Sequence, residues 1–148
     1  KPVAGRSFDR ELAQRLLDFW DSRLISSQHS EEISEFQWWF ERGVFSDEVL
    51  LEKISCTLRK IQSEKFNLYL IINSLDKFPA TLAASVSQVL HYVIFNALPR
   101  SVAVDFSGGR LLVLLKMIEQ SEDVSVQARG MEIRRRLLKL GLKEYFSE

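Results

Sequence analysis

Residues 46–61 read SDEVLLEKISCTLRKI. Ser46 stands where a hydroxyl group can accept a hydrogen bond from a free backbone N–H of a first helical turn. The apolar residues that follow at helical spacing are Leu50, Ile54, Leu58 and Ile61. The stretch therefore predicts a capped helix over residues 47–63 whose apolar row faces a core.

Similar signals on both sides predict six further helices. Their expected ranges are 8–27, 31–42, 67–77, 79–97, 108–121 and 123–140. The capping and stop signals are Ser7 and Asn67 at helix starts, Pro79 in a first turn, and Gly43 and Gly141 after helix ends. The apolar runs 68–72 and 111–115 are also compatible with short buried strands. Because no hairpin turn residues flank these runs, helix is the preferred interpretation.

Seven helices joined by short turns predict an all-α fold. Antiparallel helix pairs stacked side by side form an α-solenoid of the HEAT or TPR kind, with roughly 34–47 residues in each repeat. No exact internal repeat is visible, so we expect an irregular stack of about seven helices. Residues 1–148 are expected to form a single helical domain, and the start Lys1-Pro2-Val3 suggests a fragment of a longer multidomain protein.

The composition is that of a globular domain, with 46% hydrophobic and 27% charged residues. The net charge is zero, so no global field attracts nucleic acid or anionic lipid. Residues 1–52 nevertheless carry 6 Lys or Arg against 11 Asp or Glu, and the remaining residues carry 14 against 9. Cys56 is the only cysteine, and no apolar run reaches the ~18 residues of a membrane span. We therefore expect a cytoplasmic domain without membrane contact.

No pattern of catalytic residues stands out. The segment Ser107-Gly108-Gly109-Arg110 lacks the spacing of a phosphate-binding loop. His29 and His91 have no neighbours at metal-ligand spacing. Cys56 lies in the middle of a predicted helix and off its apolar row, so a small, partly buried residue is expected. The sequence thus predicts a protein that is not an enzyme, with no cofactor and no metal.

Residues 36–40 read FQWWF and hold two of the three tryptophans. On a helix, Phe36, Trp39 and Phe40 share a broad face, whereas Trp38 points away from it. We interpret the block as part of a core that is packed on two sides. The alternative is that Trp38 is an exposed anchor for a protein partner, because such anchors are enriched in tryptophan.

The last predicted helix is basic. Its Lys and Arg residues are Arg129, Arg134, Arg135, Arg136, Lys139 and Lys143. Arg129, Arg136 and Lys143 are seven residues apart and therefore line one flank. A solvated face is the simplest interpretation, and a contact with nucleic acid or an acidic protein surface is the alternative. With Trp38, the candidate interaction residues on this helix are Arg129, Arg135, Arg136, Lys139 and Lys143.

Three segments together resemble a known group of proteins. Residues 17–24 read LDFWDSRL, residues 35–48 read EFQWWFERGVFSDE, and residues 136–146 read RLLKLGLKEYF. They resemble the C-terminal, HEAT-like helical region of large bacterial proteins that carry P-loop NTPase or sirtuin-like domains upstream, many of them similar to antiphage defence systems. The chain departs from that pattern at Gln37, where a glycine is usual, and at Val44, where a lysine is frequent.

The resemblance implies a non-catalytic protein-interaction, scaffolding or sensor domain at the C-terminal end of a larger bacterial nucleotide-handling protein. The expected partner is a protein or the upstream domains of the same chain. The alternative is nucleic-acid binding through the basic last helix, residues 129–143.

Overall fold

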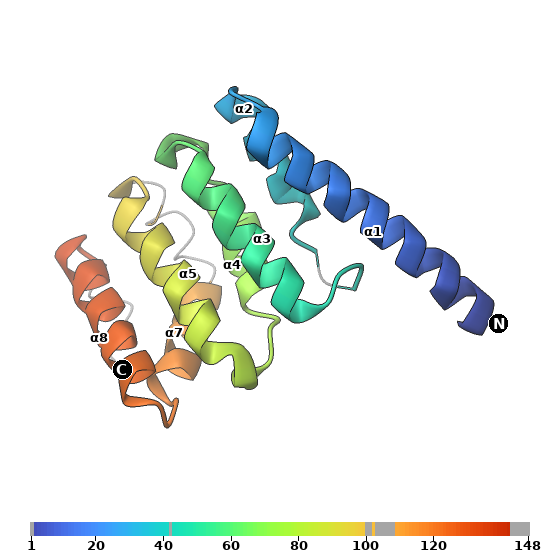
Figure 1. Ribbon diagram of the computed structural model, residues 1–148. Coiled ribbons are helices and arrows are strands. Elements are labelled where there is room, and N and C mark those ends of the chain that lie inside the picture. The colour runs from blue at the N-terminus through green and yellow to red at the C-terminus, as the bar shows by residue number, and fades with distance from the viewer. Residues whose placement is uncertain (1, 42, 100–101, 103–108, 143–148) are drawn as a thin grey trace. The chain divides into compact units, whose positions relative to one another are not determined.

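The computed structural model describes residues 2–41, 43–99, 102 and 109–142, with side chains except at residues 2–9 and 30. These residues form helices and no strand (Figure 1). The α-helices are α1 (Pro2–Ser26), α2 (Ser30–Ser34), α3 (Asp47–Lys60), α4 (Leu68–Leu75), α5 (Ala83–Asn96), α7 (Arg110–Glu119) and α8 (Val124–Lys139). Three short 3-10 helices are η1 (Glu35–Trp39), η2 (Ser63–Lys65) and η3 (Ala80–Leu82). The predicted all-α class is confirmed for this part of the chain.

The predicted capping residues act as expected at several helix ends. The side chain of Ser46 accepts a hydrogen bond from the Val49 N–H at 3.3 Å, and that of Asn67 accepts one from the Leu70 N–H at 3.1 Å. Gly141 follows α8 with a φ of 87°, a left-handed conformation that favours glycine. Local capping chemistry therefore sets these boundaries.

Two predicted helix boundaries are wrong. The first helix begins at Pro2 and not after Ser7, because proline is well tolerated in a first turn. The helix expected over 31–42 is the short α2 followed by η1. Here the Gln37 side-chain amide donates to the Ser34 carbonyl oxygen at 3.0 Å. An unbroken α-helix would use that oxygen for the backbone N–H four residues later.

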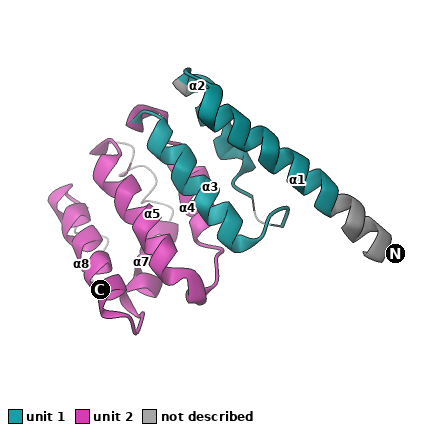
Figure 2. Ribbon diagram, in the orientation of Figure 1, with its two compact units in different colours: residues 1–62 teal, residues 63–148 magenta. Residues whose placement is uncertain are grey.

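The chain divides into two compact units, residues 1–62 and residues 63–148 (Figure 2). In the first unit, α3 packs against α1, α2 and η1. In the second unit, α8 packs against both α5 and α7, and α4 packs against α5 and α7. That the whole chain is a single domain stays a prediction.

Trp20 on α1 is the centre of the first unit. Its side chain is fully buried, and its ring lies 5.6 Å from the Phe36 ring and 6.2 Å from the Phe40 ring, both stacked. Its indole Nε1–H donates to the Thr57 hydroxyl on α3 at 3.0 Å. A second link between these helices is the ion pair of Lys53 and Asp21.

Two sequence expectations for the first unit need correction. The helical spacing of Leu12 and Phe19 predicts that they lie on the buried face of the first helix. Both are exposed, and α1 instead buries Trp20 and Leu24 on the side that packs against α3 and η1. Cys56 is exposed and not partly buried, since the buried side of α3 carries Thr57 and Leu58.

In the second unit, α5 and α8 run parallel to each other. Three pairs of contacting residues advance in the same direction along both helices: Ser87 with Arg129, His91 with Glu132, and Phe95 with Arg136. On its other sides α5 also packs against α4 and α7. Its apolar residues are accordingly buried around much of the helix: Ala83, Val86, Val89, Leu90, Val93 and Ile94.

Gly130 allows α8 to lie close to α7. A Cβ atom at this position would stand 3.0 Å from Cγ of Glu119 and 3.1 Å from Cγ2 of Ile118. These distances are shorter than ordinary van der Waals contacts, so the side chains of Glu119 and Ile118 would have to move to make room for a larger residue.

Among the helices that the structure describes, none is by itself long and apolar enough to cross a membrane. The segments Leu68–Leu75 and Ala80–Asn96 reach the length and apolar composition of a membrane span only when they are taken together. The two segments of this pair are bent by 114° relative to each other.

The bond between Trp20 and Thr57 gives a test of this packing. Thr57→Val keeps the side-chain shape but leaves the buried indole N–H without an acceptor, which costs about 1–3 kcal/mol. We expect urea unfolding to show that loss. Thr57→Ser, which keeps the hydroxyl group, should lose clearly less. Equal stability of the valine variant and the wild type would mean that the bond does not hold α1 to α3.

Candidate functional site

A hollow of about 420 Å³ lies between α5 and α8. We call it the basic hollow. Its lining residues are His91 and Phe95 from α5 and Glu132, Arg135, Arg136 and Lys139 from α8. On each helix these residues are three or four positions apart, so they project from one face. The parallel packing of the two helices turns these faces toward each other.

The α5 side of the basic hollow is aromatic. The rings of His91 and Phe95 stack with their centroids 4.2 Å apart. Nε2 of His91 lies 2.9 Å from Oε1 of Glu132, which is a hydrogen-bond distance. His91, expected to be isolated near the edge of the core, thus pairs with a carboxylate of α8.

Arg136 is the most constrained cation of the basic hollow. Its guanidinium carbon stands 5.7 Å from the centroid of the Phe95 ring, a distance at which a cation is attracted by the ring. Its Nε is buried and has no hydrogen-bond partner. A buried donor of this kind is unusual, because leaving it unpaired costs free energy. Because this Nε is shielded from solvent, a ligand in the hollow meets the charge of the Arg136 guanidinium group and not this donor.

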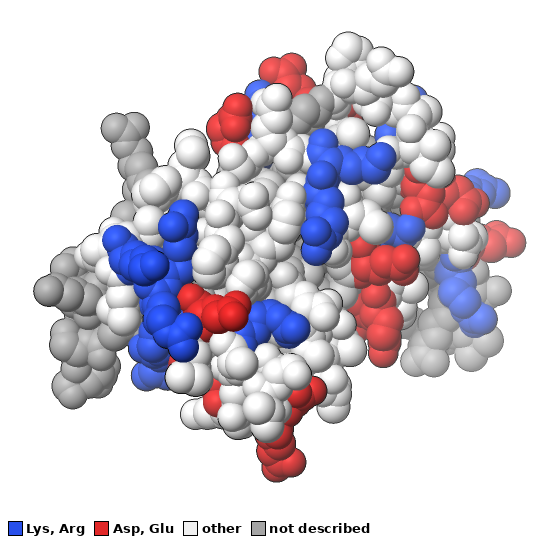
Figure 3. Space-filling model, turned by 60° about the vertical axis from the view of Figure 1, so that its left-hand side comes forward, with Lys and Arg blue, Asp and Glu red and all other residues white. Residues whose placement is uncertain are grey.

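Arg135 and Lys139 add two exposed cations to the same hollow. On the side of the molecule that Figure 3 presents, Lys and Arg side chains gather around acidic ones. Among the described residues that line the hollow, Glu132 is the one acid, and its carboxylate is paired with His91. The arrangement can bind an anion.

The other two arginines of α8 are used within the fold. Arg129 donates to the buried Ser87 hydroxyl at 2.7 Å. Arg134 donates from Nε and a terminal nitrogen to both carboxylate oxygens of Glu119, at 2.6 and 2.7 Å. These hydrogen bonds raise the pKa of Arg134 above its ordinary value. Both side chains stabilise the packing of α8 on its neighbours.

The predicted interaction residues are therefore only partly brought together. Arg135, Arg136 and Lys139 share the basic hollow. Arg129 lies on the same flank as Arg136, as expected, but that flank faces α5 and Arg129 is held by Ser87. Lys143 lies outside the described residues.

The structure corrects the interpretation of Trp38 as a core residue. Its side chain is 63% exposed, whereas Phe36 and Phe40 beside it are buried. The 3-10 turn of η1 directs Trp38 outward. Its role as an anchor for a partner stays a prediction.

The sequence analysis missed the contribution of α5 to the site. His91 and Phe95 are four residues apart, a spacing that places them on one helical face. That signal does not say which basic residues would face them, because the pairing of α5 with α8 is a tertiary contact.

Within the part of the chain that the structure describes, no group of three or more His, Cys, Asp or Glu side chains is placed to hold a metal ion. The described side chains of the basic hollow are three cations, one carboxylate, one imidazole and one phenyl ring.

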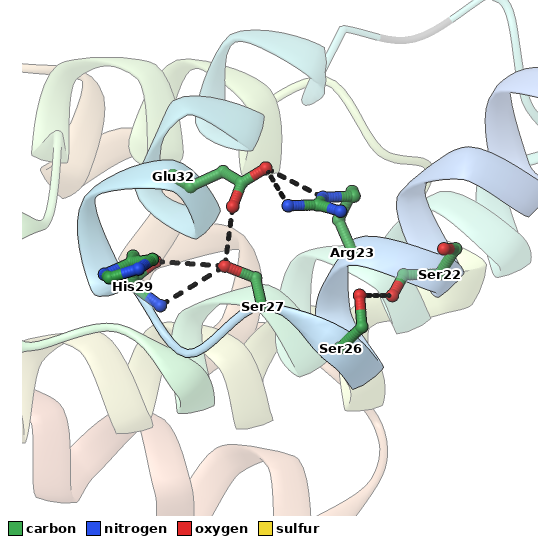
Figure 4. Close-up of polar contacts among 6 residues, drawn as sticks. All are labelled: Ser22, Arg23, Ser26, Ser27, His29 and Glu32. Atoms are coloured by element: carbon green, nitrogen blue, oxygen red, sulfur yellow. Dashed lines mark hydrogen bonds and ion pairs between the residues drawn. The ribbon is translucent and has the colours of Figure 1, made fainter.

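A second polar cluster orders the turn between α1 and α2 (Figure 4). The Ser27 hydroxyl donates to Glu32 at 2.7 Å and accepts from the His29 backbone N–H at 3.2 Å. Nε and a terminal nitrogen of Arg23 lie 2.7 and 2.6 Å from the other Glu32 carboxylate oxygen. The hydrogen bond from Ser27, and then that from Arg23, hold the pKa of Glu32 below its ordinary value. His29 lies in this turn.

No family model, curated protein or solved structure matches this chain.

The hydrogen bonds to Glu32 predict that the stability of the turn between α1 and α2 depends on pH. Because the folded-state pKa is depressed, the carboxylate stabilises the turn above the unfolded pKa, and this contribution is lost as the pH falls through the folded value. We expect Ser27→Ala to raise the pKa of Glu32 toward its ordinary value in a carbon-detected NMR titration.

Ser26→Ala is the matched control, since the Ser26 hydroxyl donates to the Ser22 carbonyl oxygen and not to Glu32. This control variant should leave the pKa of Glu32 unchanged. An unmoved Glu32 pKa in the Ser27 variant would contradict the assigned cause.

Proposed function

We propose that this chain is a non-catalytic protein-interaction module that binds an acidic segment of a partner protein in the basic hollow. One observation carries the proposal. The side chain of Arg136 lines the same hollow as the two exposed cations Arg135 and Lys139. A carboxylate that enters the hollow is attracted by the charges of all three.

A carboxylate suits the hollow in both charge and shape. The planar guanidinium group matches two carboxylate oxygens, and charge-assisted bonds of this kind are stronger than neutral ones. The ring of Phe95 is 40% exposed and offers an apolar surface beside the cations. The aliphatic stem of an aspartate or glutamate, or an apolar neighbour in the partner, can pack on that ring.

Nucleic acid is the weaker candidate because few cations are available to it. Arg129 and Arg134 are held by Ser87 and Glu119, which leaves Arg135, Arg136 and Lys139 on the described part of α8. Proteins with strongly salt-dependent DNA binding make about 6–10 phosphate contacts.

We further propose that the helices form an irregular α-solenoid of the HEAT or TPR kind. In such a stack, equivalent helices of successive pairs lie side by side and run in the same direction. The parallel contact of α5 with α8 and the packing of α4 against α7 support this arrangement for the second unit. Solenoids present extended surfaces to partners, which agrees with an interaction role.

The biological setting is part of the same proposal. The resemblance to the C-terminal region of bacterial nucleotide-handling proteins suggests a cytoplasmic scaffold or sensor whose partner is another protein or an upstream domain. The exposed Trp38 supplies a second anchor on the first unit.

The test compares an acidic peptide with DNA. A fluorescein-labelled ten-residue glutamate peptide and a labelled 20-base-pair duplex are titrated by fluorescence anisotropy at low and physiological salt. We expect the Arg135→Ala, Lys139→Ala double variant to weaken peptide binding by about five- to thirtyfold, since each exposed ion pair contributes up to ~1 kcal/mol. The Arg136→Met variant should weaken peptide binding by more than this double variant does.

The matched control is the Arg15→Ala, Lys116→Ala double variant, which removes the same charge from exposed positions outside the hollow. It should bind the peptide like the wild type. Duplex binding with a salt slope of about −2.7, the value for three phosphates, and no peptide binding would replace the proposal by nucleic-acid recognition. Equal losses of peptide affinity in both double variants would mean that the overall charge of the protein, and not the basic hollow, determines binding.

A further inference from the structure

The first unit holds a separate hollow of about 230 Å³, lined by Phe19, Phe36, Trp39, Glu32 and Glu35. We call it the aromatic hollow. It joins one exposed residue of α1 to the α2 and η1 segment. Its composition is the opposite of that of the basic hollow, since its walls are three aromatic rings and its charged groups are carboxylates.

The three rings are close enough to act on one ligand together. The ring centroids are 6.0 Å apart for Phe19 and Phe36, 6.2 Å for Phe19 and Trp39, and 4.9 Å for Phe36 and Trp39. A cation seated over this triangle therefore lies within about 6 Å of each centroid, the range of cation–π attraction. The planes of Phe36 and Trp39 meet at 71°, so they form two walls of a corner.

Two of the three rings are open to solvent. Phe19 is 52% exposed and Trp39 is half-buried, whereas Phe36 is buried and forms the base. Phe19 and Trp39 expose apolar surface to water, and a ligand that covers this surface gains free energy by removing it from water.

The two carboxylates give the aromatic hollow its charge preference. Glu32 is fixed in position by Arg23 and Ser27, and Arg23 offsets its charge. Glu35 is exposed at the start of η1, and its carboxylate adds negative charge to the same hollow. An anion is therefore disfavoured and a cation is favoured.

We propose that the aromatic hollow binds a quaternary ammonium group, carried by a trimethyllysine side chain of a partner protein. Methyl groups on the nitrogen can pack by van der Waals contact on Phe19 and Trp39, the two rings of the hollow that are open to solvent. They also remove the strongly hydrated N–H donors of an ordinary lysine, which lowers the cost of leaving water. Recognition of quaternary ammonium groups by several aromatic rings is a general use of cation–π attraction. This site goes beyond the proposed binding of acidic segments, since it lies in the other unit and takes the opposite charge.

The protein itself supplies the readout. It contains three tryptophans, so an NMR spectrum of the full chain shows three indole N–H signals. Choline is titrated against 3,3-dimethylbutanol, the uncharged analogue with carbon in place of nitrogen. We expect choline to shift the Trp39 signal with saturation and to leave the buried Trp20 signal in place. The uncharged analogue should shift it much less.

Two substitutions at the rim test the site without emptying the core. Phe19→Leu should weaken choline binding by about two- to fivefold, the loss of one exposed cation–π contact. Glu35→Gln should weaken it by a similar factor of about two to five. Glu41→Gln removes the same charge from an exposed residue that does not line the hollow, and it should bind like the wild type.

A trimethyllysine peptide and phosphatidylcholine vesicles then separate the two sources of this group. Tighter binding of the peptide than of free choline supports the proposal, and sedimentation with vesicles without peptide binding overturns the choice of a protein partner. Equal shifts from choline and its uncharged analogue, or unchanged affinity in both the Phe19 and Glu35 variants, would overturn cation recognition. None of these outcomes bears on the basic hollow, whose residues are untouched.

Discussion

The parallel packing of α5 on α8 is the contact on which the second unit depends. Parallel neighbours cannot be joined by a short turn, so the chain inserts α7 between them in sequence, and α7 packs against both. The close approach of α7 and α8 at Gly130 keeps this three-helix group together. Because polar contacts follow each other along α5 and α8, they also fix the rotation of α8 about its axis. The basic hollow is a consequence of that rotation.

The first unit depends in a similar way on one side chain. Trp20 combines a large buried ring with one N–H that needs an acceptor, and Thr57 provides it. Once Trp20 points into the core, the preceding residue is turned by about 100° around the helix. Phe19 is thereby placed beside Phe36 and Trp39 at the edge of the aromatic cluster. The same indole that stabilises the unit thus leaves a neighbouring ring available at the surface.

Local signals in the sequence predicted the helices well, because capping by Ser46 and Asn67 and the left-handed glycine Gly141 act within a few residues. They did not predict which face of a helix is covered. Cys56 and Trp38 are exposed because of what packs against α3 and η1, and this depends on residues far away in the chain. The basic residues of α8 were visible in the sequence. That Arg129 and Arg134 are paired within the fold was not, since their partners lie on α5 and α7.

The two hollows differ in how tightly their charged groups are held. Glu32 is fixed by two hydrogen-bonding partners before any ligand arrives, so a cation in the aromatic hollow meets a wall that is already ordered. Arg136 is also ordered, by its contact with Phe95, but one of its donors stays unpaired. Leaving that donor unpaired costs about 1–3 kcal/mol, a notable part of the stability of a small domain. A ligand finds Arg136 already ordered, whereas Arg135 and Lys139 are exposed and must be immobilised on binding. Affinity at the basic hollow should therefore depend more on Arg136 than on the exposed cations around it.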